Sequence, residues 1–131
     1  MNARIPEYLM VEDNGYDVEI ALSDFEEHGI ANIFHVVRDG TEALNYLFDE
    51  DGFLRAEPPK AIFLDLHMPK ISGLELLRRI KSHDQTKGIP VIVLKSSISP
   101  VEVNECQQLG INDFVEKPLT YNNFVSTIQS F

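Results

Sequence analysis

The sequence has 131 residues and 44% hydrophobic content, which is the size and composition of one globular domain, so we expect a single domain over residues 1–131. It carries 21 acidic and 11 basic residues, a formal net charge of −10. This charge argues against binding to nucleic acid or to an anionic membrane surface, because both require clustered Lys and Arg. The apolar runs are too short for a membrane span or a signal peptide, and there is one cysteine, so we expect a cytoplasmic protein.

Short β-branched or apolar runs, typical of strands, alternate with longer segments whose apolar residues recur every three or four positions, typical of helices. Asp13 or Asn14 is a good N-cap for the first helix, which Gly29 closes. Residues 49–59, rich in Pro, Gly and acids, predict an exposed loop after the second helix. Pro100 fits the first turn of the fourth helix. In chain order the predicted strands are residues 8–11, 33–37, 61–64, 91–94 and 112–116, and the last helix covers about residues 121–129.

The strands of this pattern are apolar on both faces, which predicts a parallel sheet covered by helices on both sides. Right-handed crossovers between parallel strands then favour an α/β fold, a flavodoxin-like three-layer sandwich. We expect a five-stranded parallel sheet in the order 2-1-3-4-5 with five helices. Binding sites in such sheets lie beyond the carboxyl ends of the strands, which makes the residues at those ends the candidates for function.

Three carboxylates and two lysines, which follow four of the predicted strands, are expected to converge on one rim. Glu12 and Asp13 follow the first, Asp65 the third, Lys95 the fourth and Lys117 the fifth. Polar residues commonly follow strands, and Asp13 has a simpler explanation as a helix cap. That explanation suits Asp65 less well, because this acid interrupts an apolar run, where burial without a partner is costly.

Carboxylates gathered at one rim need a cation, since each pair at 4 Å repels by ~4 kcal/mol at an effective dielectric constant near 20. Hard oxygen ligands with open positions suit Mg²⁺, which typically takes one or two carboxylates together with phosphate oxygens. A carboxylate beside Mg²⁺ and a lysine is placed to attack a phosphoryl donor, because both cations neutralise the transferred oxygens. The pattern therefore favours an aspartyl phosphate at Asp65.

Five segments, taken in order, carry a family resemblance. They are Val11-Glu12-Asp13-Asn14, Val37-Arg38-Asp39-Gly40 with Ala43-Leu44, Leu64-Asp65-Leu66-His67-Met68-Pro69 with Gly73, Ile89-Pro90-Val91-Ile92-Val93-Leu94, and Lys117-Pro118. Together they resemble the receiver domain of two-component response regulators over essentially the whole chain. The last helix ends the sequence, which suggests a stand-alone receiver, and the acidic loop with residues 36–40 is most similar to single-domain regulators paired with bacterial phytochrome-type histidine kinases.

The resemblance implies a role for each charged residue of the rim. Asp65 would accept a phosphoryl group from the phosphohistidine of a sensor histidine kinase, and Lys117 would contact the phosphoryl oxygens. Asp13, Asp65 and the backbone carbonyl of His67 would bind Mg²⁺, with Glu12 acting through ordered water. The peptide bond from Lys117 to the following proline would be cis.

Two positions bear on how the family's switch would work in this chain. Phe114 occupies the aromatic switch position and is equally a natural core residue of a central strand. Lys95 stands where the family expects Thr or Ser, and Ser96 does not replace it because a one-residue slip reverses the face of a strand side chain. Three interpretations of Lys95 are open: it reaches the phosphoryl oxygens, it pairs in advance with Asp65 or Asp13, or it extends into solvent.

His67 and Cys106 have both a chemical and an ordinary structural interpretation. His67, two residues after Asp65, could touch the path of a hydrolytic water, although an exposed loop histidine usually has no chemical role. Cys106 shares helical spacing with Val103 and Leu109, which predicts a core position.

Three functions compete. The leading hypothesis is a stand-alone response regulator in a phosphorelay, which signals by changing its binding to other proteins or by forming a homodimer, for example through its closing helix. Such a protein is not an enzyme for external substrates, because it catalyses only its own phosphorylation and dephosphorylation. An aspartyl-phosphate hydrolase would have an acid two residues after the nucleophile, where this chain has His67. A pseudo-receiver, an interaction module not controlled by phosphorylation, is favoured by Lys95 and disfavoured by the acids and Lys117.

Overall fold

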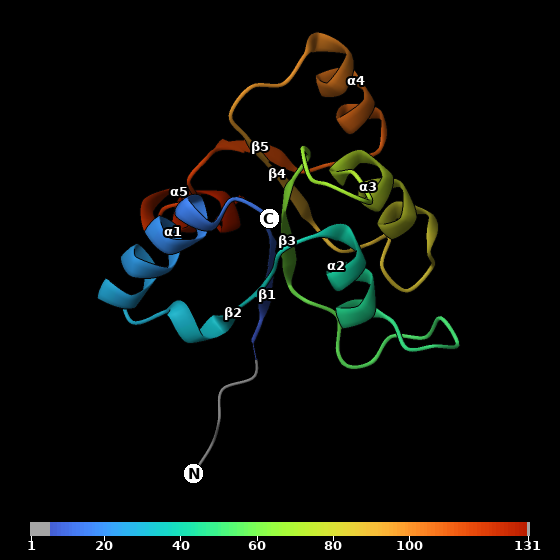
Figure 1. Ribbon diagram of the computed structural model, residues 1–131, viewed down its shortest axis with the longest axis horizontal. Coiled ribbons are helices and arrows are strands. Elements are labelled where there is room, and N and C mark those ends of the chain that lie inside the picture. The colour runs from blue at the N-terminus through green and yellow to red at the C-terminus, as the bar shows by residue number, and fades with distance from the viewer. Residues whose placement is uncertain (1–5, 131) are drawn as a thin grey trace.

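The computed structural model describes residues 6–130, which form an α/β fold with a five-stranded parallel sheet in the order β2-β1-β3-β4-β5. Helices α1 and α5 lie on one side of the sheet and α2 and α3 on the other, with α4 beyond α3 (Figure 1). The strands are β1 (Tyr8–Val11), β2 (Phe34–Val37), β3 (Ala61–Asp65), β4 (Val91–Lys95) and β5 (Asp113–Glu116). The helices are α1 (Gly15–Glu27), the 3₁₀ turn η1 (Ala31–Ile33), α2 (Gly40–Leu47), α3 (Gly73–Ser82), α4 (Pro100–Gln108) and α5 (Tyr121–Ile128).

The predicted fold class, strand order and five helices are confirmed, with small corrections at element ends. Asn14, rather than Asp13, caps α1, because its side chain accepts from the N–H of Asp17. The prediction that the second strand begins at Ile33 is wrong, since this residue belongs to η1 and its N–H donates to the Ile30 carbonyl at 3.1 Å. Residues 49–59 form a largely exposed loop, as predicted.

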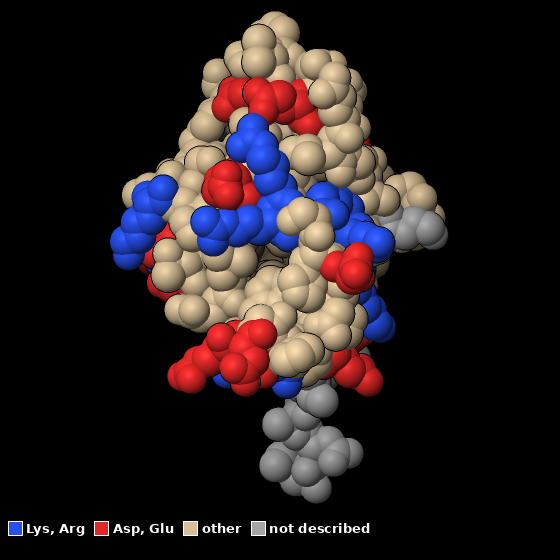
Figure 2. Space-filling model, turned by 90° about the vertical axis from the view of Figure 1, so that its right-hand side faces the viewer, with Lys and Arg blue, Asp and Glu red and all other residues tan. Residues whose placement is uncertain are grey.

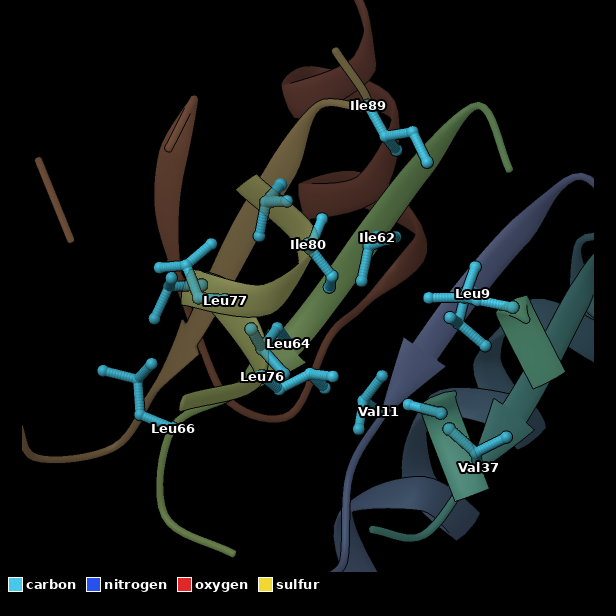
Figure 3. Packing of buried hydrophobic residues seen from close by; sticks show 14 of the residues in the cluster. Leu9, Val11, Val37, Ile62, Leu64, Leu66, Leu76, Leu77, Ile80 and Ile89 are labelled. Carbon is cyan, nitrogen blue, oxygen red and sulfur yellow. The ribbon is translucent and has the colours of Figure 1, made fainter. Parts of the chain in front are cut away.

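Two clusters of buried side chains hold the layers together. On the side of α2 and α3, the sheet residues Leu9, Ile62 and Leu64 pack with Leu77 and Ile80 of α3 (Figure 3). On the opposite side, aromatic residues of α1, β2, β3 and α5 pack against one another. The apolar residues of α5 belong to this second cluster, so they serve core packing in this structure.

Helices α3 and α4 differ in how much of each is buried. Leu76, Leu77 and Ile80 of α3 are fully buried, whereas Cys106 is the buried residue of α4, in the position predicted for it. Apolar burial is the main stabilising contribution to a docked helix. Helix α4 is therefore attached to the sheet by much less apolar surface than α3.

The charges are unevenly distributed on the side of the molecule that carries α3. Figure 2 shows Lys and Arg side chains in a band across the middle of this side, with Asp and Glu side chains above and below. Helix α3 contributes Arg78, Arg79 and Lys81, of which Arg78 pairs with Glu105 of α4 at 2.6 Å. An acidic chain thus presents a locally basic helix next to α4.

Candidate functional site

The three acids predicted at the strand ends come together in the structure. One carboxylate oxygen each from Glu12, Asp13 and Asp65 lies within 4.8 Å of the other two. Glu12 and Asp65 are buried, with 1% and 3% of their surfaces exposed, and Asp13 is half-buried. The register explains the proximity: β1 and β3 are parallel neighbours with Val11 opposite Leu64, so the residues that follow Val11 lie beside Asp65.

Lys117 is the cation at the centre of this acidic cluster. Its Nζ lies 3.1 Å from Glu12 Oε2 and 3.3 Å from Asp65 Oδ2, and its side chain is only 10% exposed. It also lies 3.4 Å from Asp17 Oδ2 in the first turn of α1, a contact that the sequence analysis missed. The available signal was the place of Asp17 in the first turn of the helix that follows the first strand, at the same end of the sheet as the acids.

Burial and mutual repulsion shift the protonation of these groups. Burial, followed by the neighbouring Asp65, raises the pKa of Glu12 to about 7. The same two causes raise the pKa of Asp13 above its ordinary value. Burial alone would lower the pKa of Lys117, but the carboxylates of Glu12 and Asp65 outweigh it, and the pKa lies above its ordinary value. The cluster therefore holds more negative charge than one lysine balances, and it attracts protons or a further cation.

The β3–α3 loop is packed tightly against the end of β3. The His67 N–H donates to Asp65 Oδ1 at 3.2 Å, and the Gly73 N–H donates to the Leu66 carbonyl at 2.8 Å. A Cβ at residue 73 would lie 2.3 Å from both the Asp65 carbonyl oxygen and the Leu66 Cα, so the first turn of α3 requires glycine there. The backbone that carries Asp65 is fixed directly by the start of α3.

The same loop reaches α4 through an exposed side-chain contact. His67 Nε2 lies 2.8 Å from Glu102 Oε2, and Glu102 belongs to the capping box of α4 together with Ser99. Glu102 was not predictable from the sequence as a partner of His67, because the two residues are 35 positions apart and neither has a local signal for the other. This contact connects the residue after the Asp65 strand to the N-terminus of α4.

Lys95 does not join the acidic cluster. Within residues 6–130 it forms no ion pair, and its Nζ lies 5.9 Å from the centroid of the Phe114 ring, within the range of a cation–π contact. The prediction that two lysines converge on the rim is therefore corrected to one, and advance pairing of Lys95 with Asp65 or Asp13 is absent. The neighbouring strand β5 instead offers the lysine ammonium the ring of Phe114, which is half-buried and packs against the core.

The peptide bond between Lys117 and Pro118 is cis, as the sequence resemblance implied.

Comparison with known proteins places this geometry in a family. Residues 8–129 match the family described as the response regulator receiver domain. The chain belongs to the receiver domain family of response regulators. The fold of this receiver is thus that of a protein of two-component signalling, as the resemblance predicted.

Two solved structures similar to this receiver, AtBRR and RcpA, are associated with phytochromes by name, and response regulator Rcp1 is a further relative. The bacteriophytochrome response regulator AtBRR is 39% identical with a TM-score of 0.80, over 96% of this chain and 91% of that one. The phosphorylated cyanobacterial phytochrome response regulator RcpA is 32% identical with a TM-score of 0.75, over 96% and 89% of the two chains. Response regulator Rcp1 of Synechocystis sp. is 29% identical over 121 residues, 92% of this chain and 82% of that protein.

The acidic cluster of this receiver suits the cation that its family uses. Receiver domains bind Mg²⁺ at an acidic pocket, and Glu12, Asp13 and Asp65 offer three carboxylate oxygens close to one another. Hard oxygen donors with further positions open to water are what Mg²⁺ prefers.

None of the helices within residues 6–130 is both long and apolar enough to cross a membrane.

Proposed function

We propose that this receiver is a stand-alone response regulator that accepts a phosphoryl group on Asp65 from a sensor histidine kinase and signals by changing its binding to other proteins. The observation that carries the proposal is the position of Asp65, a buried carboxylate with two further carboxylates on one side and Lys117 Nζ at 3.3 Å. An acid with only a structural role would need a single partner. Here three acids lie together and one lysine pairs with two of them, which suits a site built to receive a divalent cation and a phosphoryl group.

The reaction is a displacement at phosphorus. A carboxylate oxygen of Asp65 attacks the phosphorus, an O–P bond forms, and the P–N bond to the kinase imidazole breaks with its electron pair remaining on nitrogen. Lys117 stabilises the negative charge of the phosphoryl oxygens, since its ammonium already lies beside Asp65. Bound Mg²⁺ supplies further neutralisation of those oxygens. Asp13, Asp65 and the His67 carbonyl would hold it, with Glu12 acting through water.

The chain acts on no external substrate in this proposal, because the reacting carboxylate is its own. Added phosphoryl charge at Asp65 would bias the β3–α3 loop, which already contacts α4 through His67 and Glu102. The surface around α4 is then the part whose binding changes.

The names of the relatives support a partner of the phytochrome type. AtBRR is described as a bacteriophytochrome response regulator, and RcpA as a phosphorylated phytochrome response regulator. We infer that the donor is a phytochrome-type sensor histidine kinase, and that no nucleic acid or membrane is involved, in keeping with the net charge of −10.

The test is intact mass after incubation with Mg²⁺ and phosphoramidate, whose P–N bond resembles that of phosphohistidine, with acetyl phosphate as a second donor. We expect the parent to gain one phosphoryl group and Asp65→Asn to gain none. Asp84→Asn makes the same chemical change at an exposed acid of another loop, and should gain one group like the parent. A folded parent that gains no mass from either donor at saturating Mg²⁺ would instead support the pseudo-receiver.

A further inference from the structure

Arg38 directly contacts the segment that carries two of the three acids. It follows Val37, the last residue of β2, and its guanidinium donates from Nε to the Glu12 carbonyl at 3.1 Å and from a terminal nitrogen to the Asp13 carbonyl at 2.9 Å. These are the peptide carbonyls of consecutive residues. Two parallel donors on one planar group fix the orientation of both peptide units.

The backbone of the contacted segment is held from the end of β2, while Lys117 and the Asn14 N–H contact the Glu12 carboxylate itself. β1 ends at Val11 and α1 begins at Gly15, so Glu12 and Asp13 belong to neither element. The Glu12 N–H donates to the Val37 carbonyl at 3.0 Å, so the end of β2 holds this segment through both its backbone and the Arg38 side chain. Since the orientation of a peptide unit sets the direction of the neighbouring Cα–Cβ bond, Arg38 influences where both carboxylates point.

The charge of Arg38 has no carboxylate partner to explain its location. Within residues 6–130 it forms no ion pair, and its own N–H donates to Glu42 Oε1 at 3.0 Å. Its terminal nitrogen lies beside the start of α1, where a Cβ on Gly15 would come within 3.1 Å. A cation is disfavoured at a helix N-terminus, so the two carbonyl contacts are what hold the guanidinium there.

We propose that Arg38 is a positioning residue for the acidic cluster, holding the backbone of Glu12 and Asp13 so that their carboxylates face Asp65 in the arrangement that binds Mg²⁺. The inference rests on the proposed function, because it concerns the same site. It assigns to β2 a part in a site that is otherwise built from β1, β3 and β5.

The positioning role and a purely electrostatic role predict effects of opposite sign. A cation near the site repels Mg²⁺, so if Arg38 acted only through its charge, its removal would tighten Mg²⁺ binding. If it acts by orienting the ligands, its removal loosens Mg²⁺ binding. Outer-shell partners of metal ligands typically contribute about 10–100-fold in metal affinity, more than a screened surface charge contributes.

The experiment measures the dissociation constant of Mg²⁺ by calorimetry on the unphosphorylated full chain for the parent, Arg38→Ala, Arg38→Lys and Arg55→Ala. Arg55 is the matched control, because it is an exposed arginine whose Nε also donates to a backbone carbonyl, that of Asn45, in another part of the molecule. We expect Mg²⁺ to bind Arg38→Ala about tenfold more weakly. Arg38→Lys should also bind more weakly than the parent despite its unchanged charge, because one ammonium lacks the planar fork. Arg55→Ala should bind like the parent.

The melting temperature of each variant in EDTA shows whether a loss of affinity is a loss of folding. We expect values close to the parent for all three, since Arg38 and Arg55 are exposed residues. If Arg38→Ala is unfolded, Arg38→Lys decides, and parent-like affinity there overturns the inference. Parent-like or tighter binding by a folded Arg38→Ala also overturns it, while the proposed function stands. A parent that binds no Mg²⁺ overturns both, and that result is distinct because it does not depend on any variant.

Discussion

Helices α3 and α4 both contact the loop that follows Asp65, yet they are attached to it by different means. The start of α3 packs its Gly73 directly against the backbone of Asp65 and Leu66, and three fully buried side chains hold the rest of the helix. Helix α4 has one buried residue and two exposed polar contacts, a hydrogen bond between Glu102 and His67 and an ion pair between Glu105 and Arg78. Close packing resists displacement, whereas exposed ion pairs contribute little free energy. A change of charge at Asp65 is therefore expected to move α4 more readily than α3.

The largest expected effect tests the packing of the two helices. Leu77→Ala should lower the free energy of unfolding by about 2–5 kcal/mol, because it leaves a cavity in the core under α3. Cys106→Ala should cost about 1 kcal/mol, since it removes a single small buried group. Urea denaturation of both variants measures the difference. Equal losses at the two positions would show that α4 is as firmly packed as α3.

A second prediction concerns the pH dependence of the free energy of unfolding, which we expect to arise from the buried acidic cluster and not from the exposed contacts of α4. The pKa of Glu12 is about 7 in the folded protein and its ordinary value is 4.5, so between these values the folded state keeps a proton that the unfolded state has lost. The free energy of unfolding should fall as pH rises from 4.5 to 7 and level off above it. The raised pKa of Asp13 acts in the same direction. Denaturation in EDTA across this interval measures the slope.

Two variants test whether the titration of Glu12 causes this dependence of the free energy of unfolding on pH. Glu12→Gln should show a flatter profile, because the amide does not titrate. Glu105→Gln breaks the ion pair between α4 and Arg78, away from the acidic cluster, and should keep the slope of the parent. A parent slope retained in Glu12→Gln would contradict the assignment.

The smallest expected effect is at the contact between α4 and the loop. Glu102→Gln keeps an oxygen for the capping box with Ser99 but removes the charge that faces His67. We expect less than about 1 kcal/mol of change in global stability. Amide hydrogen exchange should nevertheless become faster in α4 and remain unchanged in α3, because the helix with less buried surface opens locally. Equal acceleration in both helices would mean that they open together.

Much of this architecture was predictable from the sequence because it depends on short-range pattern. Apolar runs without alternation predicted the parallel sheet, and the rule that sites lie at carboxyl strand ends predicted the meeting of Glu12, Asp13, Asp65 and Lys117. Glu12, Asp13 and Asp65 leave neighbouring parallel strands, so the strand order brings them together, whereas Lys117 follows β5 and its side chain reaches past β4 to Asp65.

The contacts that were missed or wrongly predicted depend on long side chains with several partners within reach. Lys95 leaves the correct end of β4 but lies over Phe114 instead of joining the acids. Arg38 was noticed only as part of a motif, and its carbonyl partners are 25 and 26 residues away. Glu102 is recognisable locally as a helix-capping residue, and nothing local indicates its second partner. The strand order specifies where the backbone at each strand end lies. The contacts made by the end of a long side chain depend instead on the residues packed around it in the folded protein.

The single thiol of the sequence is the buried residue of α4, the helix that is packed less firmly than α3. Cys106 has no exposed surface, and burial, followed by Glu102 and Glu105, raises its pKa to about 11. A thiol-specific label reacts with the thiolate and needs physical access, so labelling requires α4 to leave the sheet. The rate of modification with an excess of a chromogenic disulfide reagent thus counts openings of α4. Measured before and after phosphorylation of Asp65, this rate would report how often α4 opens in each state, without any probe built into the protein.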